Sequence, residues 1–533
     1  MTNADLIVRT LREAGIRYGF GIPSGNVLPL IEAMRRGGIH FALTAHEGSA
    51  AFAADVMGRL TGVPGLAIAT LGPGATNLTT GVGSAFLDRS PMLAITCDLH
   101  TPQLGRRIQM WIDHHTLFRP ITKATLALRK GRVAAVLEEA LALALAEPQG
   151  PVHLDLPEDV ALAPAVEDVP AIPVGRRLRA APEGALGKAA ELLRQARRPV
   201  AVIGAAAMRM AHPERLREVV ERHRLPFAST TMAKGLIDEA HPLSIGCIER
   251  ARRQVQREFL RGADLVVGLG YDVGEVEYEA WIGQVPLLAV DIEPVDADAS
   301  VRIAHEVIGD LDGSCAWLAG LPPLAHEWPA DAATRQRERF QAALRPAVSR
   351  FAPHQAIDVV RAVLPRNGIL AFDVGAHTHQ IASQWTAHAP RSFLITNVWS
   401  SMGFGLPAGI AAKLARPEQP AVAVIGDGCF QMTCGELAAA RRLGVALPVV
   451  VLDDRWLALI QIKQVKRRFG VYGTDLGPED DREPPAHYFG VPVVAVREPE
   501  ELEKALREAL RADGPTVIEA IVDGTHYAET VYD

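Results

Sequence analysis

The sequence predicts an α/β fold made of three doubly wound, parallel-sheet domains. Short apolar runs that end in Gly, Asp or Thr recur along the chain: GLAIATLGPG, PVAVIGAA, DLVVGLG, PLLAVDI, AVAVIGDG and PVVVLDD. Unbroken apolar runs of this length are typical of strands that are buried on both faces of a parallel sheet. Amphipathic stretches such as LREVVERH and LEKALREAL lie between them, which indicates helical crossover connections.

Two Pro-rich stretches divide the chain. They lie around residues 157–182 and 322–329, where neither a helical nor a strand pattern continues, and they are typical of linkers. The expected domains are therefore residues 1–165, 185–320 and 350–533, each about the size of an ordinary domain. The first and third segments both place glycine-rich turns directly after apolar runs, which would suit two related domains.

The composition excludes several classes of protein. Of 533 residues, 48% are hydrophobic, and the formal net charge of −7 disfavours a nucleic-acid partner. The five cysteines never form C-x-x-C, so neither a zinc knuckle nor a disulfide framework is indicated. The N-terminal stretch MTNADLIVRTLREAGI has helical spacing rather than a signal-peptide core, and no apolar run approaches the roughly 20 residues of a membrane span. We expect a cytoplasmic protein that binds neither membranes nor nucleic acid.

Two acidic residues follow successive apolar runs in the third segment. Asp427 follows AVAVIG, and Asp454 closes PVVVLDD. Carboxyl ends of parallel strands meet at the edge of the sheet where α/β proteins bind ligands. Mg²⁺ prefers oxygen ligands from one or two carboxylates together with phosphate oxygens. The pair predicts a metal–diphosphate site, although each motif alone is also typical of a plain turn or a solvated loop.

Several motifs in order resemble the thiamine diphosphate (ThDP) enzymes, and within them the acetolactate synthase group. In the first segment, HEGSAAFAADVMGRLTG, ATLGPGATN and GPVHLDLPEDV are similar to the half-site that binds the cofactor's pyrimidine ring. In the third, DVGAHTH, SSMGFGLPAGIAAKLA and the GDG–DD pair resemble the diphosphate half-site. TTMAKGLIDEAHPLSIG and GYDVGEVEYEAW match the central segment. The likeness spans nearly the whole chain, so it is far more specific than any single motif.

The resemblance implies ThDP and Mg²⁺ as cofactors. Glu47 stands in the position of the family's catalytic glutamate, which shares a proton with the pyrimidine ring, and Met402 in that of the apolar residue beneath the cofactor. The implied metal ligands are Asp427, Asp454 and the backbone carbonyl of Trp456. The other implied cofactor-binding residues are Pro73, Asn77, Ala376, His377, Gly428 and Cys429.

Simpler interpretations exist for these residues when each is taken alone. Glu47 would suit a helix N-terminus, and Met402 would suit an apolar core. His377 and His379 could begin a zinc site, but no nearby Cys or His completes a tetrahedron. A flavin is not expected, because GYDVGEVEYEAW misses the G-x-G-x-x-G spacing by one position, is acidic, and resembles the FAD-free relatives.

The segment RIQMWIDHHTLFRPITK occupies the position of the family's substrate-facing loop. Phe118 keeps the acetolactate synthase spacing, whereas Gln109 lies one place from the glutamine of those enzymes. His114 and His115 resemble the histidine pair of the pyruvate decarboxylase branch, which supplies a proton and releases an aldehyde, or they are a pair without catalytic duty. Lys463 lies on an expected helix beside the site, where it would receive an anionic substrate or belong to a solvated basic face.

We therefore expect an enzyme that decarboxylates a 2-oxo acid and joins the remaining fragment to a second carbonyl compound, as acetolactate synthases do. The alternatives are simple decarboxylation with release of an aldehyde, a related ThDP-dependent C–C lyase, or an inactive cofactor-binding homologue. Intact Glu47, Asp427 and Asp454 disfavour the last alternative. In the family, Glu47 of one subunit serves a cofactor held by Asp427 of another, which implies a homodimer or homotetramer with sites at the dimer interface.

Overall fold

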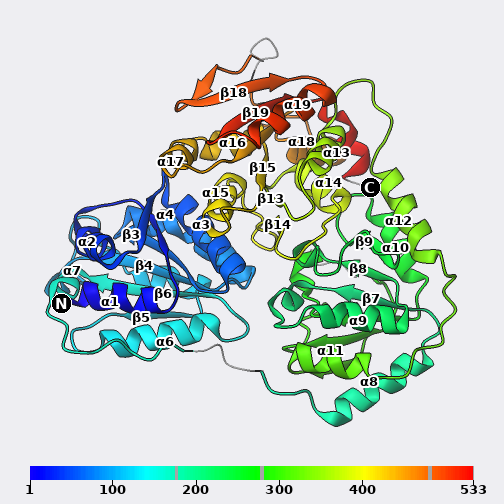
Figure 1. The fold of residues 1–533 in the computed structure, drawn as a ribbon, viewed down its shortest axis with the longest axis horizontal. Helices are drawn as coiled ribbons and strands as arrows, with labels where there is room; N and C mark the ends of the chain where they lie inside the picture. Colours follow the sequence, from blue (N-terminus) through cyan, green and yellow to red (C-terminus); the bar gives the residue numbers. More distant parts are fainter. Residues whose placement is uncertain (174–177, 277–280, 478–482, 532–533) are drawn as a thin grey trace.

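The computed structural model describes residues 1–173, 178–276, 281–477 and 483–531. The chain forms three mostly parallel sheets with flanking helices, which confirms the predicted α/β class. In Figure 1 the first part (blue to cyan) lies at the left, the central part (green) at the lower right, and the third part (yellow to red) above them. None of the described helices is long and apolar enough to cross a membrane.

The first sheet is wholly parallel, with the strand order β2-β1-β3-β4-β6-β5. Its strands are β1 (Tyr18–Gly21), β2 (His40–Leu43), β3 (Gly65–Thr70), β4 (Met92–Asp98), β5 (Ala124–Ala127) and β6 (Pro151–Pro157). Its helices are α1 (Asn3–Glu13), α2 (Leu28–Gly37), α3 (Glu47–Thr61), α4 (Pro73–Leu87), α5 (His114–Phe118), α6 (Val133–Leu145) and α7 (Glu158–Leu162).

The two faces of the first sheet carry side chains of different size. Ala67 and Ala69 face the core cluster that contains α3 and α4, whereas Leu66 and Ile68 face the cluster with α1, α2 and α6. Side chains alternate along a strand, so the sequence LAIA places small residues on one face and large residues on the other. The alanine face allows α3 to lie close to the sheet.

The central sheet has the order β12-β11-β10-β7-β8-β9 and is also parallel. Its strands are β7 (Pro199–Ile203), β8 (Phe227–Ser229), β9 (Ser244–Cys247), β10 (Leu265–Leu269), β11 (Leu287–Asp291) and β12 (Ile303–Ile308). The helices of this part are α8 (Glu183–Gln195), α9 (Glu214–His223), α10 (Arg253–Arg261), α11 (Leu311–Ala319) and α12 (Ala332–Ala343). Helix α12 packs on β9 and α10, although it lies beyond the expected central domain of residues 185–320.

The third sheet has the order β14-β13-β15-β16-β19-β18-β17. Its strands are β13 (Ile369–Phe372), β14 (Phe393–Leu394), β15 (Ala421–Gly426), β16 (Pro448–Asp453), β17 (His487–Tyr488), β18 (Val491–Val496) and β19 (Thr516–Ile521). Its helices are α13 (Pro353–Val363), α14 (Ala376–Gln384), α15 (Gly405–Ala415), α16 (Asp427–Thr433), α17 (Glu436–Arg442), α18 (Ala458–Lys466), α19 (Pro499–Ala509) and α20 (Tyr527–Thr530). The edge strand β17 pairs antiparallel with β18, a departure from the wholly parallel sheet that we expected.

One apolar core joins the first and third sheets. Helices α3 and α15 pack together, and Phe52 meets Phe404 edge-on with ring centroids 5.6 Å apart. Arg59 of α3 is paired with Asp55 at 2.6 Å and Asp88 at 3.0 Å, and it also donates to the carbonyl of Ile395 at 2.6 Å. Both ion pairs lie within the first part. The first and third parts are joined by the Arg59 bond to Ile395 and by the bonds that Asp88 accepts from the amides of Asn397 at 3.1 Å and Val398 at 2.9 Å.

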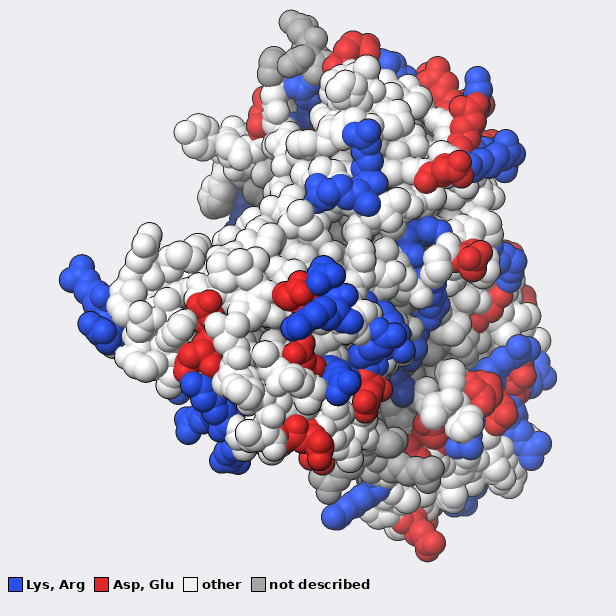
Figure 2. All heavy atoms as spheres, turned by 60° about the vertical axis from the view of Figure 1, so that its left-hand side comes forward, with Lys and Arg blue, Asp and Glu red and all other residues white. Residues whose placement is uncertain are grey.

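The charged side chains do not gather into a single basic patch on the face that Figure 2 displays. Positive and negative side chains are interspersed there, with wide uncharged areas between them. This distribution agrees with the small net charge of the sequence.

Candidate active site

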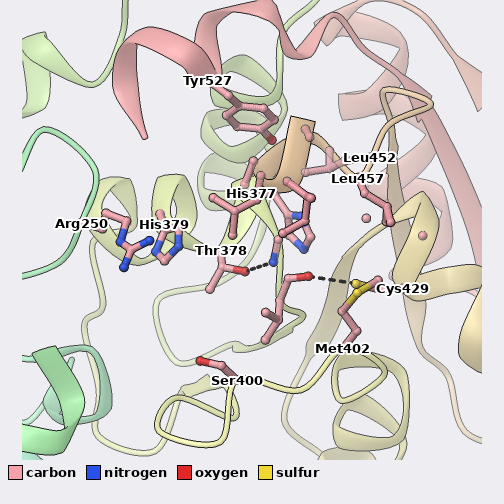
Figure 3. Close-up of a pocket in the computed structure, with 18 of the residues that line it drawn as sticks. Arg250, His377, Thr378, His379, Ser400, Met402, Cys429, Leu452, Leu457 and Tyr527 are labelled. Carbon is pink, nitrogen blue, oxygen red and sulfur yellow. Dashed lines mark hydrogen bonds between the residues drawn. The ribbon is translucent and has the colours of Figure 1, made fainter. Parts of the chain in front are cut away.

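A cavity of about 700 Å³ lies at the carboxyl end of the third sheet. Loops after β13, β15 and β16 supply one wall, and these strands are neighbours in the sheet. The opposite wall includes Glu249 and Arg250, which follow β9 of the central sheet, and Tyr527 of α20 lies at another side (Figure 3). The cavity therefore lies where α/β sheets bind ligands.

Asp427 and Asp454 both line this cavity. Their strands β15 and β16 are parallel neighbours, as the sequence predicts, so the two carboxylates follow the same edge of the sheet. Asp427 accepts hydrogen bonds from the amides of Arg455 and Gly428, each at 2.7 Å, and Asp454 accepts from the amide of Trp456 at 3.0 Å. The Gly428 amide, expected to contact the cofactor, thus points to Asp427 in this structure.

The acidic pair has the properties of a hard-cation site. Burial, together with the charges of Asp454 and Asp453, raises the pKa of Asp427 far above its usual range. Two neighbouring, partly buried carboxylates repel each other unless a cation or a proton lies between them. A divalent cation bound by carboxylate oxygens would remove this repulsion.

Among the described residues, no backbone amide donates to the carbonyl oxygen of Trp456 in the local hydrogen-bond pattern. Leu457 donates to the carbonyl of Thr474 at 2.8 Å, and Leu476 donates to the carbonyl of Arg455 at 3.0 Å. These two bonds form an antiparallel bridge between Trp456 and Asp475. They use the amide of Leu457 and the carbonyl of Arg455, the two residues that flank Trp456. The carbonyl that the resemblance assigns to the metal is therefore compatible with that role.

His377 carries an unsatisfied polar atom at the cavity. Its Nε2 is buried and has no hydrogen-bond partner in the described chain, and burial lowers the pKa of the ring to about 4. The ring lies against two glycines, because a Cβ at Gly375 or Gly426 would come within 2.7 or 2.8 Å of it. A buried group without a partner costs about 1–3 kcal/mol. A ligand oxygen at Nε2 would remove that cost.

Apolar side chains complete this half of the site. Met402 lines the cavity beside Cys429 in Figure 3, and its methyl carbon lies close to Gly428. The Cys429 thiol donates to the carbonyl of Val374 at 3.1 Å, and burial raises its pKa, so the thiol is not poised as a nucleophile. Ala376 is buried in the same wall at the start of α14.

Glu47 lies at the carboxyl edge of the first sheet, away from that cavity. Helix α3 begins at Glu47, because the His46 side chain caps it by accepting the Gly48 amide at 3.0 Å. The Glu47 side chain is 8% exposed and accepts a hydrogen bond from Asn77 Nδ2 at 3.0 Å. Pro73 begins α4 and is exposed in the single chain, as Asn77 is.

Glu436 of the third part holds the backbone just before Glu47. Its carboxylate accepts from the Ala45 amide at 3.0 Å and from the His46 amide at 3.1 Å. Burial raises the pKa of Glu436, while these amide bonds act in the opposite direction. Even so, no described residue that lines the large cavity comes from the first sheet or its helices. The two sets of predicted cofactor residues are thus separate in one chain.

Three family models match the chain. The thiamine pyrophosphate enzyme N-terminal TPP binding domain matches residues 1–117, the central domain residues 186–318, and the C-terminal TPP binding domain residues 373–520. The chain is 30% identical to the acetolactate synthase isozyme 1 large subunit of Escherichia coli, over 98% of this chain and 94% of that protein. The chain therefore belongs to the thiamine pyrophosphate enzyme family.

Other members of the family differ in the activity that their names carry. A probable 2-ketoarginine decarboxylase of Pseudomonas aeruginosa is 33% identical, over 97% of this chain and 94% of that protein. A probable acetolactate synthase large subunit of Methanocaldococcus jannaschii is 28% identical, over 98% of this chain and 92% of that protein. Relatives that are named as acetolactate synthases and as a decarboxylase thus match this chain over nearly its whole length.

The predicted substrate loop divides into buried and exposed residues. Phe118 is fully buried and stacks on His153 with ring centroids 4.3 Å apart, so in the single chain its ring packs in the core and offers no surface to a substrate. His114 is also buried, whereas Gln109 is exposed in a turn. His115 is half-buried and lines a second cavity of about 680 Å³ with His114.

Lys463 lies on α18, as predicted, and lines the large cavity. Burial, followed by the charges of Arg250 and Arg467, lowers its pKa. Within the described part of the chain, Lys463 forms no ion pair. Its ammonium group is therefore available to an anionic ligand.

The sequence interpretation missed several residues of the large cavity. Tyr527 is buried beside the acidic pair, and burial raises the pKa of its hydroxyl. Glu249 pairs at 3.0 Å with His379, which the sequence analysis did name, and this histidine lowers the pKa of Glu249 despite burial. No local pattern in GTHYAET or CIER marks these residues, because only the packing of distant segments brings them to the cavity.

The stretch GYDVGEVEYEAW lies partly outside the described residues, since 277–280 are not described. Within its described part, the Glu275 carboxylate accepts from the amides of Ala205 at 2.8 Å and Met232 at 2.9 Å, and from the Thr230 hydroxyl at 2.9 Å. Burial raises the pKa of Glu275 to about 8. Amides that follow β7 and β8 are thus already bound by a side chain of the protein.

Proposed function

We propose that this protein is a ThDP- and Mg²⁺-dependent enzyme that decarboxylates a 2-oxo acid and joins the remaining fragment to a second carbonyl compound. The observation that carries the proposal is that two partly buried, neighbouring carboxylates share one cavity with a histidine nitrogen that has no hydrogen-bond partner among the described residues. This combination suits a metal-bound diphosphate, because the carboxylates need a cation and the imidazole needs a ligand oxygen.

In this proposal each predicted metal-binding or cofactor-binding residue of the large cavity has one role. Asp427, Asp454 and the Trp456 carbonyl hold Mg²⁺, and His377 donates to a diphosphate oxygen in the tautomer that carries its proton on Nε2. Met402 supports the folded shape of the cofactor from the apolar wall, beside Ala376, Gly428 and Cys429. When bound, ThDP would supply a carbon nucleophile, and its positively charged ring would accept the electron pair left by loss of CO₂.

Glu47 is proposed to share a proton with the pyrimidine ring. Asn77 donates to one carboxylate oxygen and leaves the other oriented for a ring nitrogen. Gly74 keeps this second oxygen accessible, because a Cβ at that position would lie 3.3 Å from Glu47 Oε1. A positioned carboxylate of this kind typically contributes about 10²–10⁴-fold to a proton-transfer step.

We further propose that the complete site forms between two copies of the chain, in a homodimer or homotetramer. The support is that the Glu47 half-site and the Asp427 half-site lie apart in one chain, while Pro73 and Asn77 are exposed. The functional domains are proposed to follow residues 1–165, 185–320 and 350–533, with α12 attached to the central one. The protein is also proposed to carry no flavin, because Glu275 satisfies the amides after β7 and β8.

Simple decarboxylation with release of an aldehyde is the second candidate. It is favoured by the relative named as a 2-ketoarginine decarboxylase and by His115, whose side chain is 40% exposed beside the second cavity. The carboligase proposal rests instead on the relatives named as acetolactate synthases.

One experiment separates these candidates. Purified protein with ThDP and Mg²⁺ is given 2-oxo acids whose side chains are neutral, anionic or cationic, and the products are identified by mass spectrometry. A 2-hydroxy-2-alkyl-3-oxo acid supports carboligation, whereas a free aldehyde supports simple decarboxylation. If no 2-oxo acid releases CO₂ although ThDP binds, the proposed reaction is wrong.

A further inference from the structure

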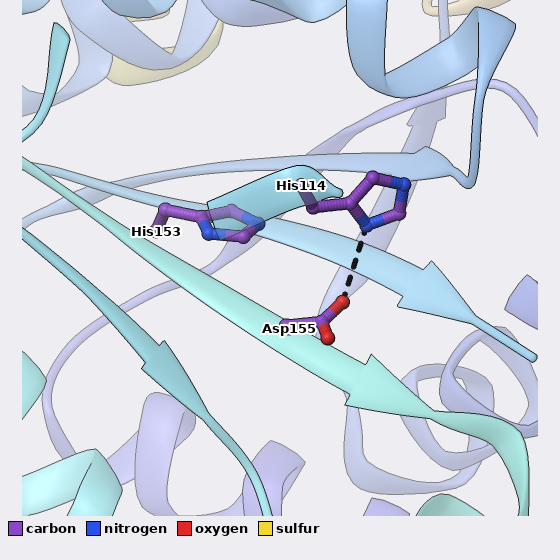
Figure 4. Close-up of side chains that lie close together, drawn as sticks. All are labelled: His114, His153 and Asp155. Atoms are coloured by element: carbon purple, nitrogen blue, oxygen red, sulfur yellow. Dashed lines mark hydrogen bonds and ion pairs between the residues drawn. The ribbon is translucent and has the colours of Figure 1, made fainter. Parts of the chain in front are cut away.

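A second group of polar side chains is buried beside the second cavity, which His115 lines, near the carboxyl ends of strands in the first sheet. Figure 4 shows His114 of α5 with His153 and Asp155 of β6. Thr96 lies opposite Asp155 on β4, and its hydroxyl oxygen is 3.0 Å from His114 Nδ1, 2.8 Å from His153 Nε2 and 3.4 Å from an Asp155 oxygen. His114 Nδ1 is also 3.2 Å from the same Asp155 oxygen.

The backbone amide of Gly72 fixes the proton positions in this group. It donates to His114 Nε2 at 3.3 Å, so this nitrogen carries no proton and His114 Nδ1 donates toward Asp155. His153 Nδ1 is buried and has no hydrogen-bond partner among the residues that the structure describes. If it carried a proton, a buried N–H would remain unpaired, so the favourable assignment has His153 Nε2 donate to Thr96 and Thr96 donate to Asp155.

This assignment disfavours a metal ion among His114, His153 and Asp155, although the three lie close enough to hold one. A metal ligand must offer a lone pair, and in this assignment both nitrogens that face the group carry protons. The Thr96 hydroxyl also lies between the three side chains, in the space that an ion would need. The group is instead a continuous chain of hydrogen bonds.

The chain of bonds ends at the loop that carries part of the Glu47 half-site. Gly72 caps α4 with a φ of 60°, in the region that favours glycine, and a Cβ there would lie 2.2 Å from the Met110 carbonyl oxygen. The same helix carries Asn77, which donates to Glu47. His114 thus holds the start of α4 through the Gly72 amide, and the Met110 carbonyl packs closely against Gly72.

We infer that His114 is a positioning residue. Asp155 and Thr96 hold its imidazole with Nε2 free of a proton, Nε2 holds the Gly72 amide, and the fixed start of α4 keeps Asn77 against Glu47. The inference rests on the proposed function of Glu47, and it distinguishes two adjacent histidines. His114 acts on the protein backbone, whereas His115 keeps one side exposed to the second cavity.

Two substitutions test the roles of the two ring nitrogens of His114 separately. His114→Asn keeps an amide near the Nδ1 position for Asp155 but cannot reach Gly72, whereas His114→Gln places an oxygen near the Nε2 position and can accept the Gly72 amide. The control is His100→Asn, which changes a half-exposed histidine of the same domain.

The first measurement is amide hydrogen exchange by mass spectrometry on the full-length protein without ThDP. In His114→Asn, peptides that contain Gly72 should exchange about five-fold faster, the effect of losing one net hydrogen bond. His114→Gln and His100→Asn should match the wild type. Equal exchange in both His114 variants, at either the wild-type rate or a faster rate, would overturn the inference. If His114→Asn does not fold, fast exchange in His114→Gln overturns it and wild-type exchange supports it.

The second measurement is deuterium exchange at C2 of bound ThDP. His114→Asn should slow it about five- to ten-fold at saturating ThDP, whereas His114→Gln should restore it. A wild-type protein that binds ThDP without accelerating C2 exchange would contradict the proposed function. Accelerated exchange in the wild type that is unaltered in His114→Asn would contradict the positioning role alone.

Discussion

The Glu47 half-site and the Asp427 half-site satisfy their polar groups in opposite ways. Glu47 already has an amide donor in Asn77, the start of α4 is bound through His114, and the backbone before α3 is bound through Glu436. Asp427 instead lies near another carboxylate, and Nε2 of His377 has no partner in the described part of the chain. In the first half-site the catalytic carboxylate is therefore held in place by the protein, whereas the second holds two neighbouring carboxylates and a histidine nitrogen that a ligand oxygen would satisfy.

This difference indicates what each half does for the cofactor. A half-site whose polar groups need a ligand supplies binding energy, because the ligand removes an existing cost. A half-site whose groups are already positioned supplies preorganisation for a proton transfer. Substitutions in the two halves should therefore separate affinity from rate.

The largest expected effect follows from Asp427→Ala. Removal of a carboxylate that holds the metal should lower the affinity for ThDP in Mg²⁺ by at least about 100-fold, since even residues behind the metal ligands typically cost 10–100-fold. Titration calorimetry with and without EDTA measures the change. The control is Asp513→Ala, an exposed aspartate of the same domain. An Asp427→Ala protein that keeps Mg²⁺-dependent ThDP affinity would show that the binding half has been misassigned.

Glu47→Gln should leave ThDP affinity nearly unchanged and lower the turnover rate by about 10²–10⁴-fold, because glutamine cannot exchange a proton with the ring. The measurements are CO₂ release and deuterium exchange at C2 of bound ThDP, each at saturating cofactor. A loss of affinity with a normal rate would place Glu47 in the binding half instead. The division of labour between a Glu47 half-site that sets the rate and an Asp427 half-site that sets the affinity would then be wrong.

Mixing the two inactive variants tests whether one site uses two chains. Under conditions that allow subunit exchange, a heterodimer of Glu47→Gln and Asp427→Ala chains contains one intact site and one site with both changes. Activity should rise from near zero to at most about half that of the wild type per dimer, because one of two equivalent sites is restored. Demonstrated exchange without recovery, or a verified monomer with normal turnover, contradicts the shared site.

The sequence predicts the sheets well because their strands are buried on both faces. AVAVIG and PVVVLD form β15 and β16, and the predicted neighbourhood of Asp427 and Asp454 follows from that pairing. The antiparallel edge strand β17 has only two residues, His487 and Tyr488, and so gives no readable apolar run. Helix α12 is separated by a Pro-rich stretch from the part it packs on, so its membership depends on tertiary contacts.

Residues whose role depends on a distant partner are harder to predict. His153 and Asp155 alternate with apolar residues in PVHLDLP, which was a usable signal of a polar face inside a buried strand. Their partner Thr96 lies on another strand and gives no signal of its own. Phe118 keeps a family spacing, yet it packs on His153 in the core, because spacing along the chain does not determine the direction of a side chain.

His377→Phe should weaken ThDP binding by about ten-fold, the value of a hydrogen bond to a charged group, while the rate at saturating ThDP changes little. The cofactor-free protein should be at least as stable as the wild type in urea unfolding, because the substitution removes a buried nitrogen without a partner. Lower stability together with unchanged ThDP affinity would mean that the nitrogen is satisfied within the protein. The affinity assigned to this half-site would then come from the metal alone.

The smallest effect is expected from substitution of Lys463, which lines the same cavity as the Asp427 half-site. If its ammonium receives an anionic group of the substrate, Lys463→Met should raise KM for a 2-oxo acid about two- to five-fold and leave kcat unchanged, as expected for a partly exposed ion pair. Lys463→Arg should restore KM.

The pH dependence of KM tests the same contact. Because burial lowers the pKa of Lys463, the charge is lost at a lower pH than for an ordinary lysine. The wild-type KM should therefore rise with pH in the alkaline range, and Lys463→Met should lack that rise. Identical KM profiles for wild type and Lys463→Met would assign Lys463 to the solvated basic face of α18, and substrate recognition would then lie elsewhere in the cavity.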